Sequence, residues 1–128
     1  MSVIISSINY CPVKSVSYQS INRCEIKQNI GIVGDRIFAF AKDLDLNNAR
    51  LFEKSPEERR GKWNNILTLK NSPALNKYNF LFKENKLTLT FKGKKILTVN
   101  ASELSERKLL SNKIIELENS LKEPIVLM

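Results

Sequence analysis

The sequence predicts a mainly β fold: a β-barrel-like antiparallel sheet with a C-terminal amphipathic helix and a short helix in the loop at 52–63. Three observations predict this class. Short segments rich in Ile, Val and Phe are separated by turn residues, apolar and polar residues alternate twice within 78–91, and one apolar stripe at helical spacing follows near the C-terminal end. Short strands closed by one helix are typical of a small bent sheet or barrel. The 128 residues, 42% of them hydrophobic, suit one domain with its own core.

The first third of the chain is expected to supply three strands. Residues 2–10 and 19–27 are rich in strand-forming residues and flank a bend. Gly31 and Gly34 then indicate a turn that leads into an apolar segment at 37–41. Both faces of that segment are apolar, which predicts a central strand covered on two sides.

Residues 42–63 are polar, charged and without strand periodicity, so we interpret them as a long loop. Within it, Ser55 and Pro56 have the pattern of a helix start, and Gly61 suits a helix end. Two glutamates after the proline would lie at the positive end of the helix dipole. This pattern predicts the short helix inside the 52–63 loop.

The second half predicts a three-stranded meander followed by a helix. Aromatic residues at 78, 80 and 82 and apolar residues at 87, 89 and 91 alternate with polar ones across a turn, which predicts a hairpin. A turn at Gly93 leads into a further strand at 96–100. Asn100 and Glu103 have the spacing of a capping box. The apolar stripe of the following helix comprises Leu110, Ile114, Leu117 and Leu121.

We expect three regions along the chain. Residues 1–100 form the β domain, residues 101–122 form the amphipathic helix that packs on the barrel or links it to another domain, and residues 123–128 begin a further strand. The longest apolar runs are too short to cross a bilayer. No secretory leader pattern is present at the N-terminus, so we expect a cytoplasmic protein without a membrane partner.

Composition excludes several kinds of chemistry. The chain has no histidine, which removes Ser-His-Asp and Cys-His nucleophile pairs, and two cysteines alone cannot complete a tetrahedral zinc site. Cys11 and Cys24 are therefore interpreted as free thiols. Twenty-one basic against 13 acidic side chains give a net charge of +8, which favours anionic partners.

Three segments resemble a known family. YCPVKS at 10–15, GIVGDRIFAF at 31–40 and NNAR at 47–50 resemble the N-terminal β-barrel domain of MOSC proteins, the molybdenum cofactor sulfurase C-terminal group. In that family the barrel precedes a larger MOSC domain, whose cysteine is thought to ligate molybdenum. The resemblance implies that this chain is the N-terminal module, with the MOSC domain absent from it and supplied by the same or a separate chain.

The resemblance also implies a cofactor and a site. Lys14, Ser15 and Arg36 would hold the pterin phosphate of the molybdenum cofactor (molybdopterin) in a complete MOSC protein, and Arg50 would lie near the cofactor cleft. We expect no catalytic residue in this chain and no metal ligand. The complete protein would be a molybdenum-dependent reductase of N-hydroxylated compounds or a sulfur carrier, with a small-molecule substrate and, for reduction, a separate electron-transfer partner.

The residue chemistry agrees with an anion site. A guanidinium, an ammonium and a hydroxyl are the donors that a phosphate group prefers. Asp35 is expected to have a structural role, either accepting backbone hydrogen bonds or orienting Arg36. The alternative to an anion site is that Lys14 and Arg36 are ordinary solvated surface charges.

Two alternative functions remain open at this point. Tyr78, Phe80 and Phe82, beside several lysines, have the composition of a platform for single-stranded nucleic acid, although such alternation is more typical of a core. A stand-alone interaction scaffold is the other alternative. Cys11 lies near Lys14 in the sequence and suggests sulfur transfer, but free cysteines are usually small core residues.

Overall fold

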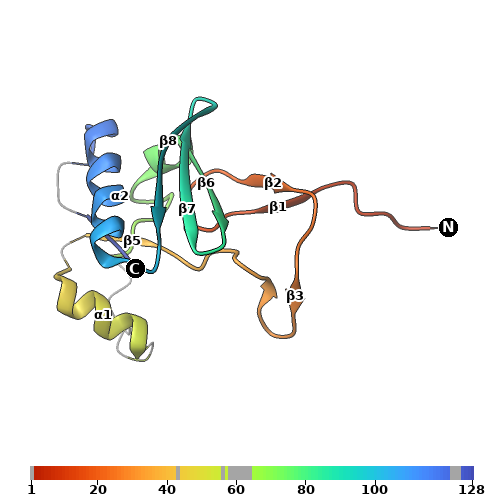
Figure 1. The fold of residues 1–128 in the computed structure, drawn as a ribbon, viewed down its shortest axis with the longest axis horizontal. Coiled ribbons are helices and arrows are strands. Elements are labelled where there is room, and N and C mark those ends of the chain that lie inside the picture. The colour runs from red at the N-terminus through yellow and green to blue at the C-terminus, as the bar shows by residue number, and fades with distance from the viewer. Residues whose placement is uncertain (1, 43, 56, 58–64, 122–124) are drawn as a thin grey trace.

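The computed structural model describes residues 2–42, 44–55, 57, 65–121 and 125–128. Within these ranges the chain is mostly β, with two α-helices beside several small antiparallel sheets (Figure 1). The mainly β class is confirmed. The described strands form one three-stranded sheet and separate two-stranded pairs, and none of these closes into a barrel. The barrel prediction needs this correction because most strands outside the meander span two or three residues, too few for a continuous closed ladder.

The meander is the largest sheet and contributes much of the core. Strands β6 (Tyr78–Lys83), β7 (Lys86–Phe91) and β8 (Lys94–Asn100) pair in antiparallel order, as the alternation predicted. Glu84 and Asn85 form the two-residue turn between β6 and β7, with φ of 52° and 62°. Two positive φ angles in a two-residue loop match the right-handed twist of the flanking strands.

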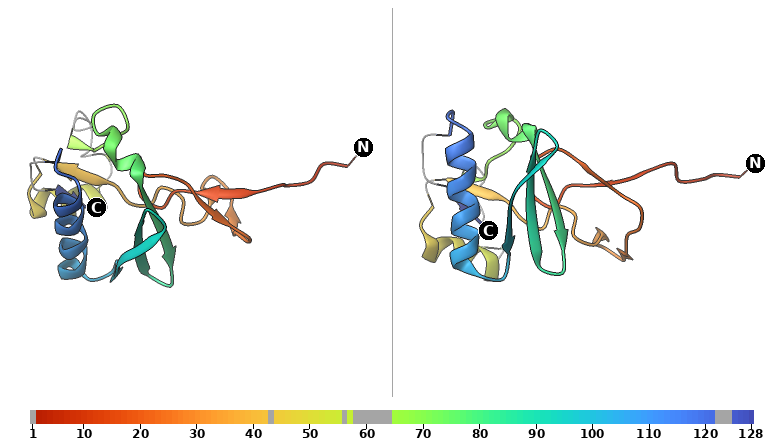
Figure 2. Two further views of the ribbon diagram at one scale, coloured as in Figure 1. Left: turned by 90° about the horizontal axis from the view of Figure 1, so that it is seen from above. Right: turned by 45° about the horizontal axis from the view of Figure 1, so that its top comes forward.

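Helix α2 (Leu104–Leu117) packs against β8 and β9 (Figure 2). Leu110 and Ile114 are fully buried, as the apolar stripe predicted. The helix is shorter than the predicted 101–122, and Leu117 and Leu121 only pack partly buried against the core. None of the described helices has the length and apolar character needed to cross a membrane.

The start of α2 differs in detail from the predicted capping box. Glu103 is the N-cap residue, and its side chain makes no capping hydrogen bond. Instead, the backbone N–H of Asn100 donates to the carboxylate of Glu106 at 3.0 Å, and the Asn100 side chain accepts the N–H of Ser102. One half of a capping box therefore exists, but its glutamate lies one turn further along the chain than predicted, and the Asn100 side chain accepts from Ser102.

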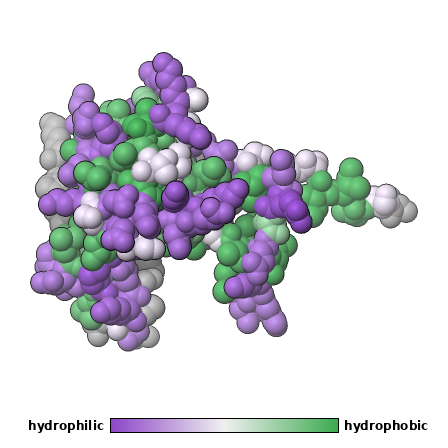
Figure 3. All heavy atoms as spheres, viewed as in Figure 1, coloured by the Kyte–Doolittle hydropathy of each residue, from purple (hydrophilic) through white to green (hydrophobic). Residues whose placement is uncertain are grey.

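The N-terminal third forms two short ribbons at one side of the molecule. Strand β1 (Ile8–Tyr10) pairs with β2 (Gln19–Ile21), and β3 (Ile26–Lys27) pairs with β4 (Gly31–Ile32). Residues 2–7, predicted as part of the first strand, are extended but join no sheet and project away from the body (Figures 1 and 3). Three apolar side chains on this arm are exposed: Val3, Ile4 and Ile5.

Strand β5 (Phe40–Lys42) lies in the interior and pairs with β9 (Ile125–Leu127), near the C-terminal end of the chain. Phe40 and Ala41 are fully buried. The prediction of a strand covered on two sides therefore holds only for the second half of the segment at 37–41, because Ile37 is 47% exposed and β5 begins at Phe40. A parallel bridge between Val13 and Phe38 extends the contact towards the N-terminal segment.

Helix α1 (Leu46–Lys54) occupies part of the region interpreted as a loop, and that interpretation is wrong there. The Asp45 carboxylate accepts the N–H of Asn48 at 2.8 Å and so caps the helix, while Ala49 and Phe52 form its buried face. Ser55 follows the helix as its C-cap, whereas the sequence predicted it as the N-cap of a helix. The remaining residues of that predicted helix, 56 and 58–63, lie outside the described residues. A short 3₁₀ helix, η3 (Pro73–Lys77), precedes the meander.

Candidate functional site

The two motif segments lie side by side through backbone hydrogen bonds. The N–H of Lys14 donates to the carbonyl of Phe38 at 2.9 Å, and the N–H of Phe38 donates to the carbonyl of Pro12 at 2.9 Å. The N–H of Arg36 donates to the carbonyl of Cys11 at 2.6 Å. The backbone therefore fixes residues 11–14 against residues 36–38.

Asp35 connects the same two segments with its side chain. Its Oδ1 accepts the backbone N–H of Cys11 at 2.9 Å, and its Oδ2 accepts Nε of Arg36 at 3.0 Å. Both contacts match the structural role expected from the sequence. Asp35 thus aligns the segments and orients the guanidinium.

Two of the motif residues have left-handed backbone conformations. Ser15 has φ of 72° and Arg36 has φ of 52°. Residues other than glycine rarely adopt this backbone conformation, and those that are held in it cluster at functional sites. At Arg36 the bonds to Cys11 and Asp35 hold the conformation in place.

Lys14 and Arg36 line one pocket of about 550 Å³. The volume lies within the range of about 300–1,000 Å³ that is common for small-molecule sites. Arg107 and Glu53 also line it. Much of the remaining wall is apolar and comprises Ile37, Phe38, Leu44, Phe52 and Ile66.

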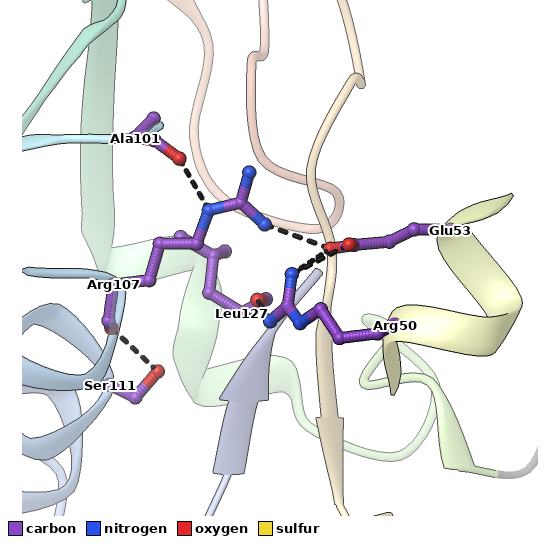
Figure 4. Close-up of polar contacts among 6 residues, drawn as sticks. All are labelled: Arg50, Glu53, Ala101, Arg107, Ser111 and Leu127. Atoms are coloured by element: carbon purple, nitrogen blue, oxygen red, sulfur yellow. Dashed lines mark hydrogen bonds and ion pairs between the residues drawn. The ribbon is translucent and has the colours of Figure 1, made fainter. Parts of the chain in front are cut away.

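Two residues of this lining, Glu53 and Arg107, belong to an ion-pair cluster that also includes Arg50 (Figure 4). Nη1 of Arg107 donates to Oε1 of Glu53 at 2.8 Å, and Nη1 of Arg50 lies 2.6 Å from each of the Glu53 oxygens. Nε of Arg107 donates to the carbonyl of Ala101, and its guanidinium lies 5.5 Å from the centre of the Phe38 ring. The cluster joins helix α1 to helix α2 across the pocket wall.

Arg50 and Ser15 are placed differently from Lys14 and Arg36. Arg50 lines a second pocket of about 170 Å³ between α1, α2 and β9, and its Nη2 lies 3.5 Å from the carbonyl oxygen of Leu127. Its Nε is buried without a hydrogen-bond partner in the described part of the chain. Ser15 is half-buried and does not line the larger pocket. Of the four expected residues, only Lys14 and Arg36 line the larger pocket.

The sequence analysis did not find Arg107. Its position relative to the apolar stripe was the available signal, because Arg107, Leu110, Ser111 and Ile114 follow at helical spacing on one face. A charge on the face that packs inward must have a buried partner or line a cavity. Arg107 does both, since its side chain is only 17% exposed and pairs with Glu53.

Cys11 is a core residue. It is 5% exposed, and its Sγ lies 2.8 Å from the carbonyl oxygen of Val13 and 3.3 Å from that of Val16. Burial raises the pKa of the Cys11 thiol, which disfavours the reactive thiolate. Cys24 is a free, partly exposed thiol. The buried position of Cys11 removes the basis for a sulfur-transfer role at this residue.

The aromatic residues of β6 belong to the core. Tyr78 and Phe80 are fully buried, and Phe82 packs edge-on against Phe38 with ring centres 5.3 Å apart. Bases need an exposed ring face for stacking. Tyr78 and Phe80 therefore do not supply the nucleic-acid platform that the alternation suggested as an alternative.

Comparison with known proteins yields no relative: no family model, no curated protein and no solved structure matches the chain. Among the described residues, no group of three or more His, Cys, Asp or Glu side chains is placed to hold a metal ion. The resemblance to MOSC proteins thus rests on the motif residues, and the site rests on its geometry.

Proposed function

We propose that the pocket lined by Lys14 and Arg36 binds the phosphate group of a small molecule. The observation that supports the proposal is that these two basic residues, which lie 22 positions apart in the sequence, line one pocket of about 550 Å³. Arg36 is 71% exposed, and its bond to Asp35 uses Nε. Within the described part of the chain, its two terminal nitrogens have no hydrogen-bond partner, so they can make the two-pronged contact that phosphate favours.

The wall of the pocket favours a ligand with an apolar or ring-shaped part. Phe38, Phe52 and Ile66 lie in the same lining as the cations. Small-molecule sites typically combine apolar walls with a few polar groups that set orientation. A phosphorylated compound with a planar ring has both of these parts.

The motif residues extend the proposal to a family. We propose that the chain is the N-terminal module of a cytoplasmic MOSC-type protein and that Lys14 and Arg36 hold the phosphate of molybdopterin. The described residues fit such a phosphate, because two cations and an apolar wall share one pocket. The bound cofactor would supply the redox chemistry, either reduction of N-hydroxylated compounds with an electron-transfer partner or sulfur transfer. This chain would contribute binding and the shape of the substrate entrance, without a catalytic residue of its own.

The test of the site uses inorganic pyrophosphate, titrated calorimetrically into the purified chain. We expect Lys14→Ala and Arg36→Ala each to weaken binding about tenfold, because each removes one charge-assisted contact. The control removes two exposed lysines of β8 that do not line the pocket, Lys94→Ala with Lys95→Ala. If the Lys14→Ala, Arg36→Ala double variant binds pyrophosphate as well as this control, the site proposal is wrong.

The family assignment needs a separate experiment. The chain is mixed with free molybdopterin, and retained pterin is measured by its fluorescence after gel filtration. We expect the wild-type chain to retain more pterin than the Lys14→Ala, Arg36→Ala variant. Equal retention by the two proteins would contradict the cofactor assignment, whatever the pyrophosphate titration shows.

A further inference from the structure

We propose that Glu53 is the counter-ion of Arg107 in the ligand-free protein. An anionic ligand that binds in the pocket then displaces Glu53 and pairs with Arg107. The inference rests on the proposed function, because it concerns the regulation of the same pocket. It follows from three features of the cluster: the fixed position of Arg107, the unequal contacts of Glu53 and the negative charge that Glu53 places in the pocket lining.

Arg107 is held in place independently of Glu53. Its Nε donates to the carbonyl of Ala101 (Figure 4). Its guanidinium also lies 5.5 Å from the centre of the Phe38 ring. Only its Nη1 is bonded to Glu53. The guanidinium therefore stays in the pocket wall when Glu53 moves away, and a ligand phosphate can replace the carboxylate as its partner.

Glu53 has unequal contacts with its two arginines. Nη1 of Arg50 lies 2.6 Å from both carboxylate oxygens, whereas Arg107 contacts Oε1 alone at 2.8 Å. Arg50 also lies three residues before Glu53 on helix α1, so these two side chains share one element. When Glu53 leaves Arg107, it keeps Arg50 as partner, and no partly buried charge is left unpaired.

Glu53 places a negative charge in the lining of a pocket that also contains Lys14, Arg36 and Arg107. A bound anion is repelled by this carboxylate and has to compete with it for Arg107. Removing the charge while keeping the size of the side chain should therefore strengthen anion binding. Lys14 and Arg36 can thus contact a ligand directly. The third cation, Arg107, becomes available only when the ligand displaces Glu53.

The test compares Glu53→Gln with wild type by calorimetric titration of inorganic pyrophosphate. We expect Glu53→Gln to bind about tenfold more tightly, because one nearby like charge is removed in a partly buried site. The matched control is Glu116→Gln, which makes the same change of charge on the exposed face of α2. Glu116 does not line the pocket, so its variant should bind like wild type. Equal or weaker binding by Glu53→Gln, relative to Glu116→Gln, overturns the inference.

A measurement on the wild-type protein does not depend on any variant folding. The side-chain Nε–H signals of Arg50 and Arg107 are followed by NMR during the pyrophosphate titration. We expect the Arg107 signal to shift with the same dissociation constant as the calorimetric one. An Arg107 signal that stays unchanged at saturation overturns the inference.

The outcomes separate the inference from the proposed function. If pyrophosphate binding requires Lys14 and Arg36 but Glu53→Gln does not bind pyrophosphate more tightly, the proposed phosphate site is supported and the proposed role of Glu53 is wrong. If pyrophosphate binding does not require Lys14 and Arg36, the proposed function falls, and the inference falls with it.

Discussion

Lys14 and Phe38 are joined by a backbone hydrogen bond of 2.9 Å, from the N–H of the lysine to the carbonyl of the phenylalanine. Phe38 also forms part of the pocket wall and carries the guanidinium of Arg107 over its ring at 5.5 Å. One residue thus links a cation of the YCPVKS segment to a cation of helix α2. The main chain thus fixes the backbone of Lys14, and a largely buried ring lies against the guanidinium of Arg107.

The left-handed conformation of Arg36 leads to a prediction about stability. With φ of 52°, position 36 favours glycine, because any β-carbon is strained there. We expect Arg36→Gly to be more stable to urea than Arg36→Ala by about 1 kcal/mol. Both variants lose the guanidinium, so pyrophosphate binding should fall equally in the two. A less stable glycine variant would contradict the conformational argument.

The two cysteines should differ in reactivity. Cys11 is buried with its pKa raised by burial, whereas Cys24 is partly exposed. We expect iodoacetamide to label Cys24 in the native protein while Cys11 stays protected, and mass spectrometry of peptides to show the difference. In urea both thiols should be labelled at similar rates. Native labelling of Cys11 as fast as that of Cys24 would show that the YCPVKS segment opens.

Glu118 should make stability depend on acid pH. Burial acts to raise the pKa of the Glu118 carboxyl, but hydrogen bonds from Lys77, Ser120 and Tyr78 outweigh it and hold the pKa below its usual value. A carboxyl whose pKa is lowered by folding stabilises the native state above its unfolded pKa, and this contribution is lost as pH falls through the folded pKa. We expect Glu118→Gln to be about 1–2 kcal/mol less stable than wild type at pH 7.

The pH series provides the check on Glu118. The free energies of unfolding of wild type and Glu118→Gln, measured in urea from about pH 7 down to about pH 3, should converge at the acid end. Glu116→Gln serves as the control, because Glu116 is exposed and pairs with Lys113 at the surface. A constant difference between wild type and Glu118→Gln across the series would contradict the assigned role of the carboxylate.

Tyr10 ties the N-terminal segment to the meander. Its hydroxyl accepts the N–H of Phe82 at 2.8 Å and lies 3.2 Å from the carbonyl oxygen of Phe82, to which it donates. We expect Tyr10→Phe to destabilise the protein by about 1–2 kcal/mol, because two backbone groups lose their partner in a partly buried place. Urea unfolding followed by circular dichroism measures this loss. Tyr18→Phe is the matched control, since Tyr18 is 74% exposed, and a similar loss in both variants would contradict the assignment.

The parts of the fold that follow local rules could be predicted from the sequence. Strands β6 to β8 show alternation of period two across short turns, and α2 shows a stripe of period 3.6, so each pattern lies within a short window. Helix α1 was missed because its buried face consists of only Ala49 and Phe52, too few for a visible period. The N-cap residue Asp45 was the remaining signal for this helix. The charged residues further along made the segment resemble a loop.

The barrel and half of the site could not be predicted because they depend on contacts between distant residues. The alternation of apolar residues does not say whether the ends of a sheet meet, and here the N-terminal strands are too short to do so. Lys14 and Arg36 were found through their motifs. Arg107 and Glu53 meet only because the folded chain brings α1 and α2 close together, and no local pattern in the sequence specifies that arrangement.

The pairing of β5 with β9 has a consequence for synthesis on the ribosome. Residues 40–42 leave the exit tunnel long before residues 125–127, so β5 must wait for its partner while most of the chain is still being made. The meander, whose strands are neighbours in the sequence, can form during that interval. Closure of the long loop between residues 42 and 125 would then be a late event in folding, and the nascent chain would expose the backbone edge of Phe40 and Ala41 until it occurs.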